Sequence, residues 1–481
     1  MADALVAGVD SSTQSTKVEL RVAATGRLVA TGRGAHPPTS PPVSEQEPEA
    51  WWDALTHALS QVREHLDRVV AISIAGQQHG FVPVDADGAT IRPAKLWNDT
   101  TSAPQAAALR DAIGAAAWAN RCGLVPVASF TITKLLWLVK HEPHHVELID
   151  KIMLPHDWLT WRLTGNHVTD RGDASGTGWW SPVDDTYRTD LLGLAVHRPD
   201  EWVARLPRVL GPREPAGTVR ADVAAELGLP EGVVVGPGTG DNMAAALGLA
   251  LAPGEVVMSL GTSGTAYAVT TEPAKDLTGA VAGFADAAGG FLPLVATLNA
   301  TKVTETVARW LGVDVAALSD MALSAPARTG LVLVPYFDGE RTPNLPDATG
   351  TWHGLRNDVT REQLARAAFT GVVNGLFGGI EALRTAGVQM GDSLRLIGGG
   401  AKSSAYRQVT ADLWGSPVTV HADAEPVATG ACVQAAAVHA DREPLDVASS
   451  WNLDEGTVVA PDPDVDGRAV RAAYREVARR S

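Results

Sequence analysis

The stretch ALVAGVDSSTQSTKVELRV, residues 4–22, decides the fold that we predict for this chain. It opens with an apolar run that ends in an acid, Asp10, and a turn rich in hydroxyl side chains follows. Residues 17–22 then alternate apolar and polar side chains. This order predicts a buried strand, a tight turn and a half-buried strand, and residues 27–33 add a third strand. We therefore expect the chain to begin with an antiparallel meander.

The same order returns past the middle of the chain. Residues 255–260 have the pattern of a strand, residues 261–264 form a turn of glycine and hydroxyl residues, and residues 265–270 give a second strand. Residues 394–397 form a further strand that runs into three consecutive glycines. Because each half begins with strand, turn and strand, we predict an internal duplication whose boundary lies near residues 233–241.

Length and composition agree with two domains. The chain has 481 residues, of which 45% are hydrophobic and 20% charged, and this balance is typical of globular proteins. We place the domains at residues 1–240 and 241–481. The formal net charge of -16 repels phosphate backbones, so nucleic acid is not an expected partner.

Three sequence features predict a cytoplasmic protein without a membrane partner. The two cysteines, Cys122 and Cys432, are far apart and indicate reduced thiols. Residues 1–10 lack the basic start of a signal peptide. The apolar runs are all shorter than the ~18 residues that a membrane span requires.

Two helices have clear signals. Residues 49–66 carry apolar side chains at helical spacing, and a buried strand over residues 69–75 follows. Residues 361–386 are preceded by Thr360, which together with Gln363 has the spacing of a capping box.

Three turns share one chemistry. Residues 10–17, 260–265 and 398–403 combine small residues, hydroxyl donors and a freely turning backbone, and the first and third each contain a lysine. Such turns can direct several N–H groups at one anion, as polyphosphates require. Each turn alone also fits an ordinary hairpin loop. Together they favour an ATP site between two lobes.

Two acids lie where catalysis would use them. Asp10 ends a buried strand and could hold Mg²⁺ beside phosphates, although a turn-starting Asp that bonds its own backbone is an equally good interpretation. Asp241 lies at the predicted start of a helix over residues 243–251, where the helix dipole is expected to lower the pKa of a carboxylate. Asp241 could be a general base at the domain boundary or only an N-cap.

Polar and aromatic residues follow the strand over residues 69–75. Gln78 and His79 come directly after it, and Trp97, Asn98 and Asp99 lie about twenty residues further on. Donors and acceptors for hydroxyls, with a ring for C–H faces, are what a polyol site needs. A single His in a loop is otherwise more often a surface residue.

These motifs, in this order and over nearly the whole chain, resemble the FGGY carbohydrate kinases, and within them the xylulokinase branch. Residues 129–141 fit the first family signature, and residues 350–369 fit the second up to its last place, where Thr370 replaces the usual acid. Gln78 stands where the branch has Met, and the first turn reads Asp-Ser-Ser-Thr where many members have Asp-Leu-Gly-Thr. The other matching stretches are residues 51–52, 75–81, 97–99, 331–342 and 396–401.

The resemblance implies an α/β fold of two ribonuclease H-like, actin-like ATPase domains with the active site in the cleft between them. It implies that Asp241 takes the proton from the sugar hydroxyl and that Asp10 helps to hold Mg²⁺. The residues implied to contact the sugar are Gln78, His79, Trp97, Asn98, Asp99 and Asn242. The residues implied to contact ATP are Thr13, Ser15, Lys17, Gly261, Thr262, Gly399, Gly400 and Ser404.

The activity implied is phosphorylation of D-xylulose to D-xylulose 5-phosphate by ATP and Mg²⁺. Kinases for ribulose, gluconate or glycerol, and a sugar-binding regulator without catalysis, are the alternatives. A homodimer is the oligomer expected at the level of the family.

Overall fold

The computed structural model describes residues 3–421 and 425–480. Its first sheet is built on the predicted hairpin, in which β1 (Leu5–Ser11) and β2 (Ser15–Val22) pair antiparallel with Asp10 opposite Lys17. On its other edge β1 pairs parallel with β5 (Val69–Gly76). The strand order is β13-β14-β5-β1-β2-β3, with β15 also on β5. The remaining strands are β3 (Leu28–Ala35), β13 (Gly217–Thr218), β14 (Val234–Val235) and β15 (Thr239–Gly240).

The second sheet repeats this plan. β16 (Val256–Leu260) and β17 (Gly264–Ala268) form the antiparallel hairpin, and β22 (Leu394–Ile397) pairs parallel with β16. The strand order is β18-β19-β17-β16-β22-β23-β24. The hairpin and its parallel neighbour thus occupy the same places in both sheets, as the predicted duplication requires. The other strands are β18 (Ala282–Ala285), β19 (Phe291–Thr297), β23 (Val418–Val420) and β24 (Thr457–Val459).

Helices cover both faces of the first sheet. Residues Leu5, Ala7 and Val9 of β1 join the core beneath α1 (Pro48–Ser60), and the alternate residue Val6 joins the core on the opposite face. That opposite face is covered by α16 (Pro426–Ala440), which also packs against α11 (Asp241–Gly248). Gly8 is required there, because a Cβ would lie 2.1 Å from the carbonyl oxygen of Ala428. Because successive side chains in a strand point to opposite faces of the sheet, Asp10 lies on the same face as Gly8, which is the face that α16 covers.

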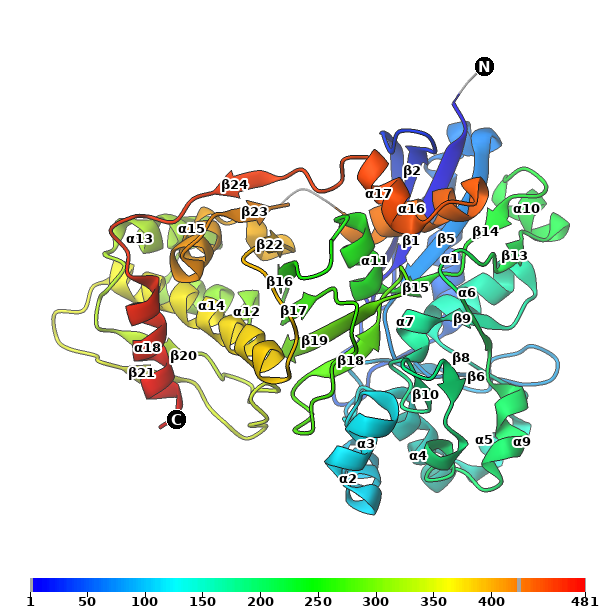
Figure 1. The fold of residues 1–481 in the computed structure, drawn as a ribbon, viewed down its shortest axis with the longest axis horizontal. Helices are drawn as coiled ribbons and strands as arrows, with labels where there is room; N and C mark the ends of the chain where they lie inside the picture. The colour runs from blue at the N-terminus through cyan, green and yellow to red at the C-terminus, as the bar shows by residue number, and fades with distance from the viewer. Residues whose placement is uncertain (1–2, 422–424, 481) are drawn as a thin grey trace.

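The chain therefore crosses between the lobes more than once. In Figure 1, α16 lies beside β1 and β5, α17 (Pro444–Ser450) packs against α16, and β24 then carries the chain back to the other lobe. Both α11 and α16 belong to the segment after residue 240 but pack on the first sheet. The division at residue 240 remains a prediction.

The second sheet is covered by a long helix and its neighbours. α14 (Arg361–Thr385) begins at the capping box that the sequence predicts: the Thr360 hydroxyl accepts from the Gln363 amide, and the Gln363 side chain accepts from the Thr360 amide. The other elements of this lobe are α12 (Thr301–Leu311), α13 (Val315–Ser324), β20 (Val332–Val334), β21 (Thr351–His353), η3 (Gly399–Lys402), α15 (Ser404–Trp414) and α18 (Gly467–Ala478).

An additional helical region extends the first lobe and lies below its sheet in Figure 1. It packs around a core of tryptophans, among them Trp118, Trp179 and Trp180, which are almost fully buried. The helices between residues 103 and 227 are α2 (Ala103–Ile113), α3 (Ala115–Cys122), α4 (Thr131–His141), α5 (Pro143–Leu148), α6 (Pro155–Thr164), α7 (Arg171–Ala174), α8 (Thr189–Leu192), α9 (Pro199–Trp202) and α10 (Ala221–Leu227). The short strands and 3₁₀ turns of the first lobe are β4 (Glu45–Gln46), η1 (Arg63–Arg68), β6 (Val82–Val84), β7 (Ala94–Lys95), β8 (Lys151–Met153), β9 (Val168–Asp170), β10 (Trp180–Ser181), β11 (Thr186–Tyr187), η2 (Val203–Arg205) and β12 (Arg208–Leu210).

One predicted helix is shorter in the structure. The sequence pattern over residues 49–66 continues past Ser60, but α1 ends there and η1 follows as a separate 3₁₀ turn. Val62 and Leu66 come after Ser60, are both buried, and continue the helical spacing of the apolar residues in α1. The apolar pattern therefore does not reveal where α1 ends. Within residues 3–421 and 425–480, no helix combines the length and the apolar character needed to span a bilayer.

Candidate active site

The two predicted catalytic acids meet in one cavity between the lobes. A cavity of about 400 Å³, here called the cleft cavity, is lined by Asp10 and Lys17 of the first hairpin and by Asp241. The second lobe contributes residues of β16, β17 and the glycine turn after β22. The further lining residues are Asn242, Ala245, Ser259, Tyr267, Ile397, Gly398, Gly399, Lys402, Glu425, Pro426 and Val427.

Asp10 is held beside a cation. Its Oδ2 lies 3.7 Å from the Lys17 ammonium, which also donates to Glu425 Oε2 at 2.5 Å. Burial raises the pKa of Asp10 to about 7; Lys17 opposes that shift, whereas Asp241 and Glu425 add to it. The other oxygen, Oδ1, is buried without a hydrogen-bond partner. Asp10 is therefore a carboxylate that needs a further positive partner.

That unpartnered oxygen fits Mg²⁺. Protein-bound Mg²⁺ is usually held by one or two carboxylates together with waters and substrate phosphates. Across the described part of the chain, no group of three His, Cys, Asp or Glu side chains could hold a metal ion by itself. Asp10 thus suits an ion that arrives with phosphate ligands rather than one bound in a protein cage.

Asp241 is the first residue of α11, and Gly240 precedes it as the N-cap. Its Oδ1 accepts from the Asn242 amide at 2.8 Å and from Asn242 Nδ2 at 2.9 Å. Burial raises the pKa of Asp241 to about 6, although the bonds from Asn242 oppose this. The lowered pKa expected from the helix dipole is therefore wrong, because desolvation outweighs the dipole. A carboxylate of this pKa is suited to accept a proton near neutral pH.

The predicted sugar residues Gln78 and Asn242 are joined directly. Asn242 Nδ2 donates to Gln78 Oε1 at 3.1 Å, and Gln78 Nε2 is buried without a partner. Thr265 of β17 donates to Asn242 Oδ1 at 3.5 Å, so the second sheet contacts the same cluster. Gly240 allows this approach, since a Cβ there would lie 2.6 Å from Gln78 Cγ.

His79 lies beside these residues in an unusual conformation. Its backbone φ of 65° is in the left-handed region that few residues other than glycine adopt. Its ring packs against Phe130 at 5.1 Å and Phe284 at 5.5 Å between centroids. Burial, with the cations Lys134 and Arg341 nearby, lowers the pKa of His79 well below its usual value. The imidazole is neutral and can both donate and accept a hydrogen bond.

Trp97 is connected to the first phosphate turn. Its indole Nε1 donates to Thr13 Oγ1 at 2.9 Å, and that hydroxyl donates to Gln77 Oε1 at 3.1 Å. Gln77 Nε2 is buried without a partner. The Thr13 hydroxyl thus links the loop that carries Trp97 to the loop after β5, which carries Gln77. Gln77 was missed by the sequence reasoning, although its position next to Gln78 on the same loop could have indicated it.

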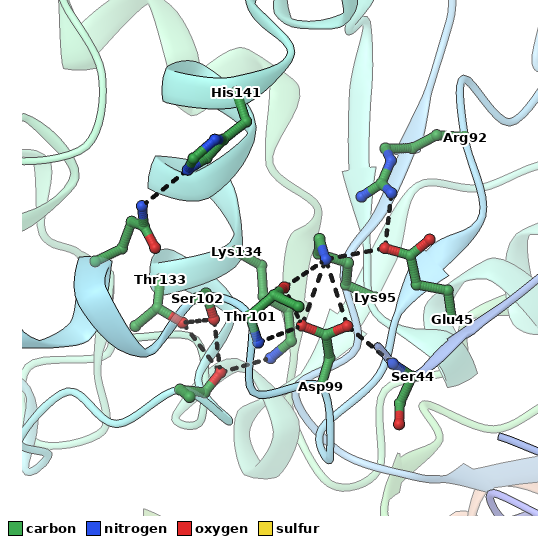
Figure 2. Close-up of polar contacts among 12 residues, drawn as sticks. Ser44, Glu45, Arg92, Lys95, Asp99, Thr101, Ser102, Thr133, Lys134 and His141 are labelled. Carbon is green, nitrogen blue, oxygen red and sulfur yellow. Dashed lines mark hydrogen bonds and ion pairs between the residues drawn. The ribbon is translucent and has the colours of Figure 1, made fainter. Parts of the chain in front are cut away.

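Asp99 is enclosed in a polar network that Figure 2 shows. The side chain is fully buried, and its oxygens accept from the Ser44 amide at 2.9 Å, from Thr101 Oγ1 at 2.5 Å and from the Lys95 ammonium at 3.4 Å. Lys95 also lies 2.9 Å from Glu45 Oε1. The Asp99 network therefore fixes the loop that carries Trp97, and a contact between Asp99 and sugar remains a prediction.

Lys134, on the other side of this network in Figure 2, donates to the carbonyl oxygens of Ala128 and Ser129. Burial lowers the pKa of Lys134 to about 7, with Asp99 opposing the shift and Lys95 adding to it. Asn98, the residue between Trp97 and Asp99, keeps a buried Oδ1 without a partner.

A second cavity, here called the outer cavity, opens next to the cleft cavity. It measures about 660 Å³, and Gly399 and Lys402 line both cavities. It brings together the predicted nucleotide residues of the second lobe, which come from the turn after β16 and from the glycine turn after β22. These are Gly261, Thr262, Gly399, Gly400 and Ser404. Thr13 and Ser15 line neither cavity.

Tyr267 and Glu425 are titratable residues of the cleft cavity that were not predicted. Tyr267 is fully buried, and its hydroxyl has no hydrogen-bond partner. Its position two residues after Thr265 on β17 places both on the face that meets α11, which strand alternation could have indicated. Glu425 precedes α16 and holds Lys17, and a contact over so long a sequence separation leaves no local signal.

Comparisons with known proteins match both halves of the chain to one family. Residues 5–248 match the model of the FGGY family of carbohydrate kinases, N-terminal domain, and residues 256–439 match its C-terminal domain. A xylulose kinase of Streptomyces coelicolor is 49% identical over 95% of this chain and 92% of its own length, and one of Haemophilus influenzae is 34% identical over 95% of each chain.

Solved structures are similar over the full length. The crystal structure of xylulose kinase from Bifidobacterium adolescentis covers 99% of both chains with a TM-score of 0.87 and 41% identity. The gluconate kinase of Lactobacillus acidophilus has a TM-score of 0.92 over 100% of this chain and 98% of its own, at 22% identity, which shows the shared fold alone.

Proposed function

The chain belongs to the FGGY family of carbohydrate kinases, and we propose that it transfers the γ-phosphate of ATP to the 5-hydroxyl of D-xylulose. It is a carbohydrate kinase with the two-lobed α/β fold of that family, as the sequence predicts. The choice of sugar is supported by the two relatives that are 49% identical, both of which are xylulose kinases.

One observation carries the proposal: Asp10 and Asp241 line a single cavity between the lobes. The outer cavity, lined by glycines and hydroxyl residues, continues from it on one side. On the other side, Asn242 connects Asp241 to Gln78. The acids thus lie between a place suited to a nucleotide and a place suited to a polyol.

Asp241 acts as the general base in this scheme. Its carboxylate takes the proton of the 5-hydroxyl as that oxygen attacks the γ-phosphorus, and ADP leaves from the opposite side. The transition state of phosphoryl transfer is loose, so the protein contributes mainly position and charge. The two bonds from Asn242 fix the direction of the Asp241 carboxylate. Closure of the lobes would exclude water and limit ATP hydrolysis.

The phosphates are held from both lobes. Asp10 would hold the Mg²⁺ that accompanies ATP, whose chemistry is to neutralise charge on the phosphate oxygens. Lys17 is released from Glu425 to the phosphates as they enter, while Thr13 and Ser15 shape the first turn. Gly261 and Thr262 receive the phosphates from the second lobe, and the adenosine lies against the residues Gly399, Gly400 and Ser404.

The sugar is held by the loop after β5 and by α11. His79 and Asn242 contact its hydroxyls, and the free Nε2 of Gln78 supplies a donor that a methionine would lack. Trp97 offers a ring face, with Asn98 and Asp99 beside it. The remaining proposals are that the enzyme acts in the cytoplasm, as a homodimer and without nucleic acid.

A substrate screen tests the proposed function. ADP release would be measured with D-xylulose, ribulose, gluconate and glycerol, and the product of the best substrate would be identified by ³¹P NMR. We expect the highest kcat/KM for D-xylulose and a 5-phosphate product. A higher kcat/KM for another polyol would transfer the assignment to that sugar, and no turnover with any of them would support a regulator.

A further inference from the structure

A buried histidine lies beneath the active site, in a cluster that the proposed mechanism does not use. His156, in the first turn of α6, is fully buried. Its Nε2 lies 3.2 Å from Asp170 Oδ1, 3.3 Å from Asp157 Oδ1 and 3.5 Å from Asp173 Oδ2. The cluster of His156, Asp157, Asp170 and Asp173 is named the His156 hub below.

The charges in the hub favour an imidazolium. Burial alone would lower the pKa of His156, but the surrounding carboxylates raise it to about 9. Burial raises the pKa of Asp157 to about 6 and that of Asp173 well above its usual value, against the attraction of His156 in both cases. The phenol of Tyr187 also lies near Asp157, whose charge adds to the effect of burial in raising the pKa of that phenol. At neutral pH one cation therefore holds together acids from α6, β9 and α7.

One branch of the hub reaches the segment that carries the base. Asp170 Oδ2 accepts from the Thr239 hydroxyl at 2.7 Å, and Thr239 lies two residues before Asp241. The ring also touches the turn before Thr239, because a Cβ on Gly238 would lie 2.6 Å from His156 Nδ1. His156 thus contacts the segment that leads into α11 both directly, at Gly238, and through Asp170.

The second branch reaches the sugar loop. Asp173 Oδ1 accepts from the His79 amide at 3.4 Å, which supports the strained backbone of that residue. The end of β5 rests directly on α6: a Cβ on Gly76 would lie 3.1 Å from His156 Cβ. Gly176, at the end of α7, lies against the His79 ring. The hub therefore contacts both the loop after β5 and the segment before α11, and its four residues are not among those that line the cleft cavity.

We propose that His156 is the common anchor of the sugar loop (residues 76–79) and the base segment (residues 238–242), and that it sets the distance between sugar and base. It is a positioning residue, and this role rests on the proposed function. Without their cation, Asp157 and Asp173 would favour the protonated form still more, and the attraction that holds Asp170 and Asp173 in their present positions would be lost. A shift of about 1 Å in a reacting group can cost about 10²-fold in rate.

The test compares His156→Gln, which removes the charge, with His156→Lys, which keeps a cation. We expect kcat/KM for xylulose to fall about 10²-fold in His156→Gln, with ATP affinity by titration calorimetry within about 3-fold of the wild type. His156→Lys should recover most of that loss. His167→Gln is the matched control, since the His167 ring bonds the Ile152 carbonyl, which lies outside both segments, and the kinetics of this variant should not change.

Two results would overturn the proposal. One is an unchanged kcat/KM for xylulose in His156→Gln; the other is an equal loss of sugar turnover and ATP affinity in a folded variant. If His156→Gln does not fold, Thr239→Val serves instead, because it removes the hydrogen bond from β15 to Asp170 and leaves His156 in place. A wild-type kcat/KM in Thr239→Val would contradict the proposed role.

A stability measurement separates this inference from the proposed function. The folded-state pKa of about 9 exceeds the ordinary value of 6.5, so the contribution of His156 to stability is complete below pH 6.5 and is lost as the pH rises through 9. The Tm of the wild type should fall from pH 7 to 9.5, and less so in His156→Lys. This result does not depend on the substrate, and an equal fall in both proteins would show that His156 is not the charged centre of the hub.

Discussion

The indole Nε1 of Trp97 donates a hydrogen bond of 2.9 Å to the hydroxyl of Thr13. Trp97 belongs to the proposed sugar site and Thr13 to the first phosphate turn, so a side-chain contact joins the two sites. The Thr13 hydroxyl passes the contact on to Gln77 at 3.1 Å. Sugar and nucleotide binding should therefore be coupled.

Trp97→Phe tests this coupling, because it removes the N–H and keeps a ring. A hydrogen bond of this kind contributes about 1 kcal/mol net. We expect KM for xylulose and Kd for ATP each to rise about 5-fold. The double variant with Thr13→Val should add little to either single variant. Trp52→Phe, which removes an indole bond to Glu226 of α10, serves as the control. Fully additive effects would mean that the contact carries no coupling.

Asp10→Asn tests the proposed metal position. The variant keeps the shape of the side chain but removes the charge that would attract Mg²⁺. We expect the Mg²⁺ concentration for half-maximal activity to rise at least ~10-fold, and wild-type activity to vanish in excess chelator. Binding of Mn²⁺ in the presence of ADP, followed by electron paramagnetic resonance, gives a readout independent of turnover. The metal would have to be placed elsewhere if Asp10→Asn bound Mn²⁺ as the wild type does.

The pH dependence of the reaction follows from the burial of Asp241. Asp241 must be ionised to act as a base, and its pKa is about 6. The rate of the chemical step should therefore fall tenfold per pH unit below about pH 6 and level off above it. Single-turnover rates between pH 5 and 8 would reveal this limb. A flat profile over that range would contradict a base with this pKa.

Asp241 should also reduce stability. Its folded-state pKa of about 6 lies above the ordinary 3.8, so ionisation destabilises the folded protein as the pH rises through 6. Asp241→Asn keeps the oxygen that accepts from Asn242 and removes the charge. We expect a gain of about 1–3 kcal/mol in the free energy of unfolding at pH 7, and a smaller one at pH 4.5. Denaturant unfolding at both pH values measures it; a loss at pH 7 would refute the argument.

The sequence predicted the parts of the fold that depend on neighbouring residues. The hairpin over residues 4–22, its repeat after residue 255 and the capping box at Thr360 are all present, because hydrophobic alternation, turn residues and capping are local. The break after Ser60 was not visible, since apolar spacing continues across it.

The site was predictable in its residues but not in its environment. Asp10 and Asp241 could be chosen from their places at strand and helix ends, and the structure brings both into one cavity. The raised pKa of Asp241 depends on burial by residues from both lobes, which no local pattern records. The same holds for the contact of Glu425 with Lys17 and for the contact of Trp97 with Thr13, where the partners are far apart in sequence.

The most direct test of the central claim is the turnover of Asp241→Asn with saturating ATP and xylulose, measured together with the Kd for ATP. General-base catalysis contributes about 10²–10⁴-fold, so we predict that kcat falls at least ~10²-fold while the Kd for ATP stays within about 3-fold of the wild-type value. Turnover close to that of the wild type would contradict the assignment of Asp241 as the base.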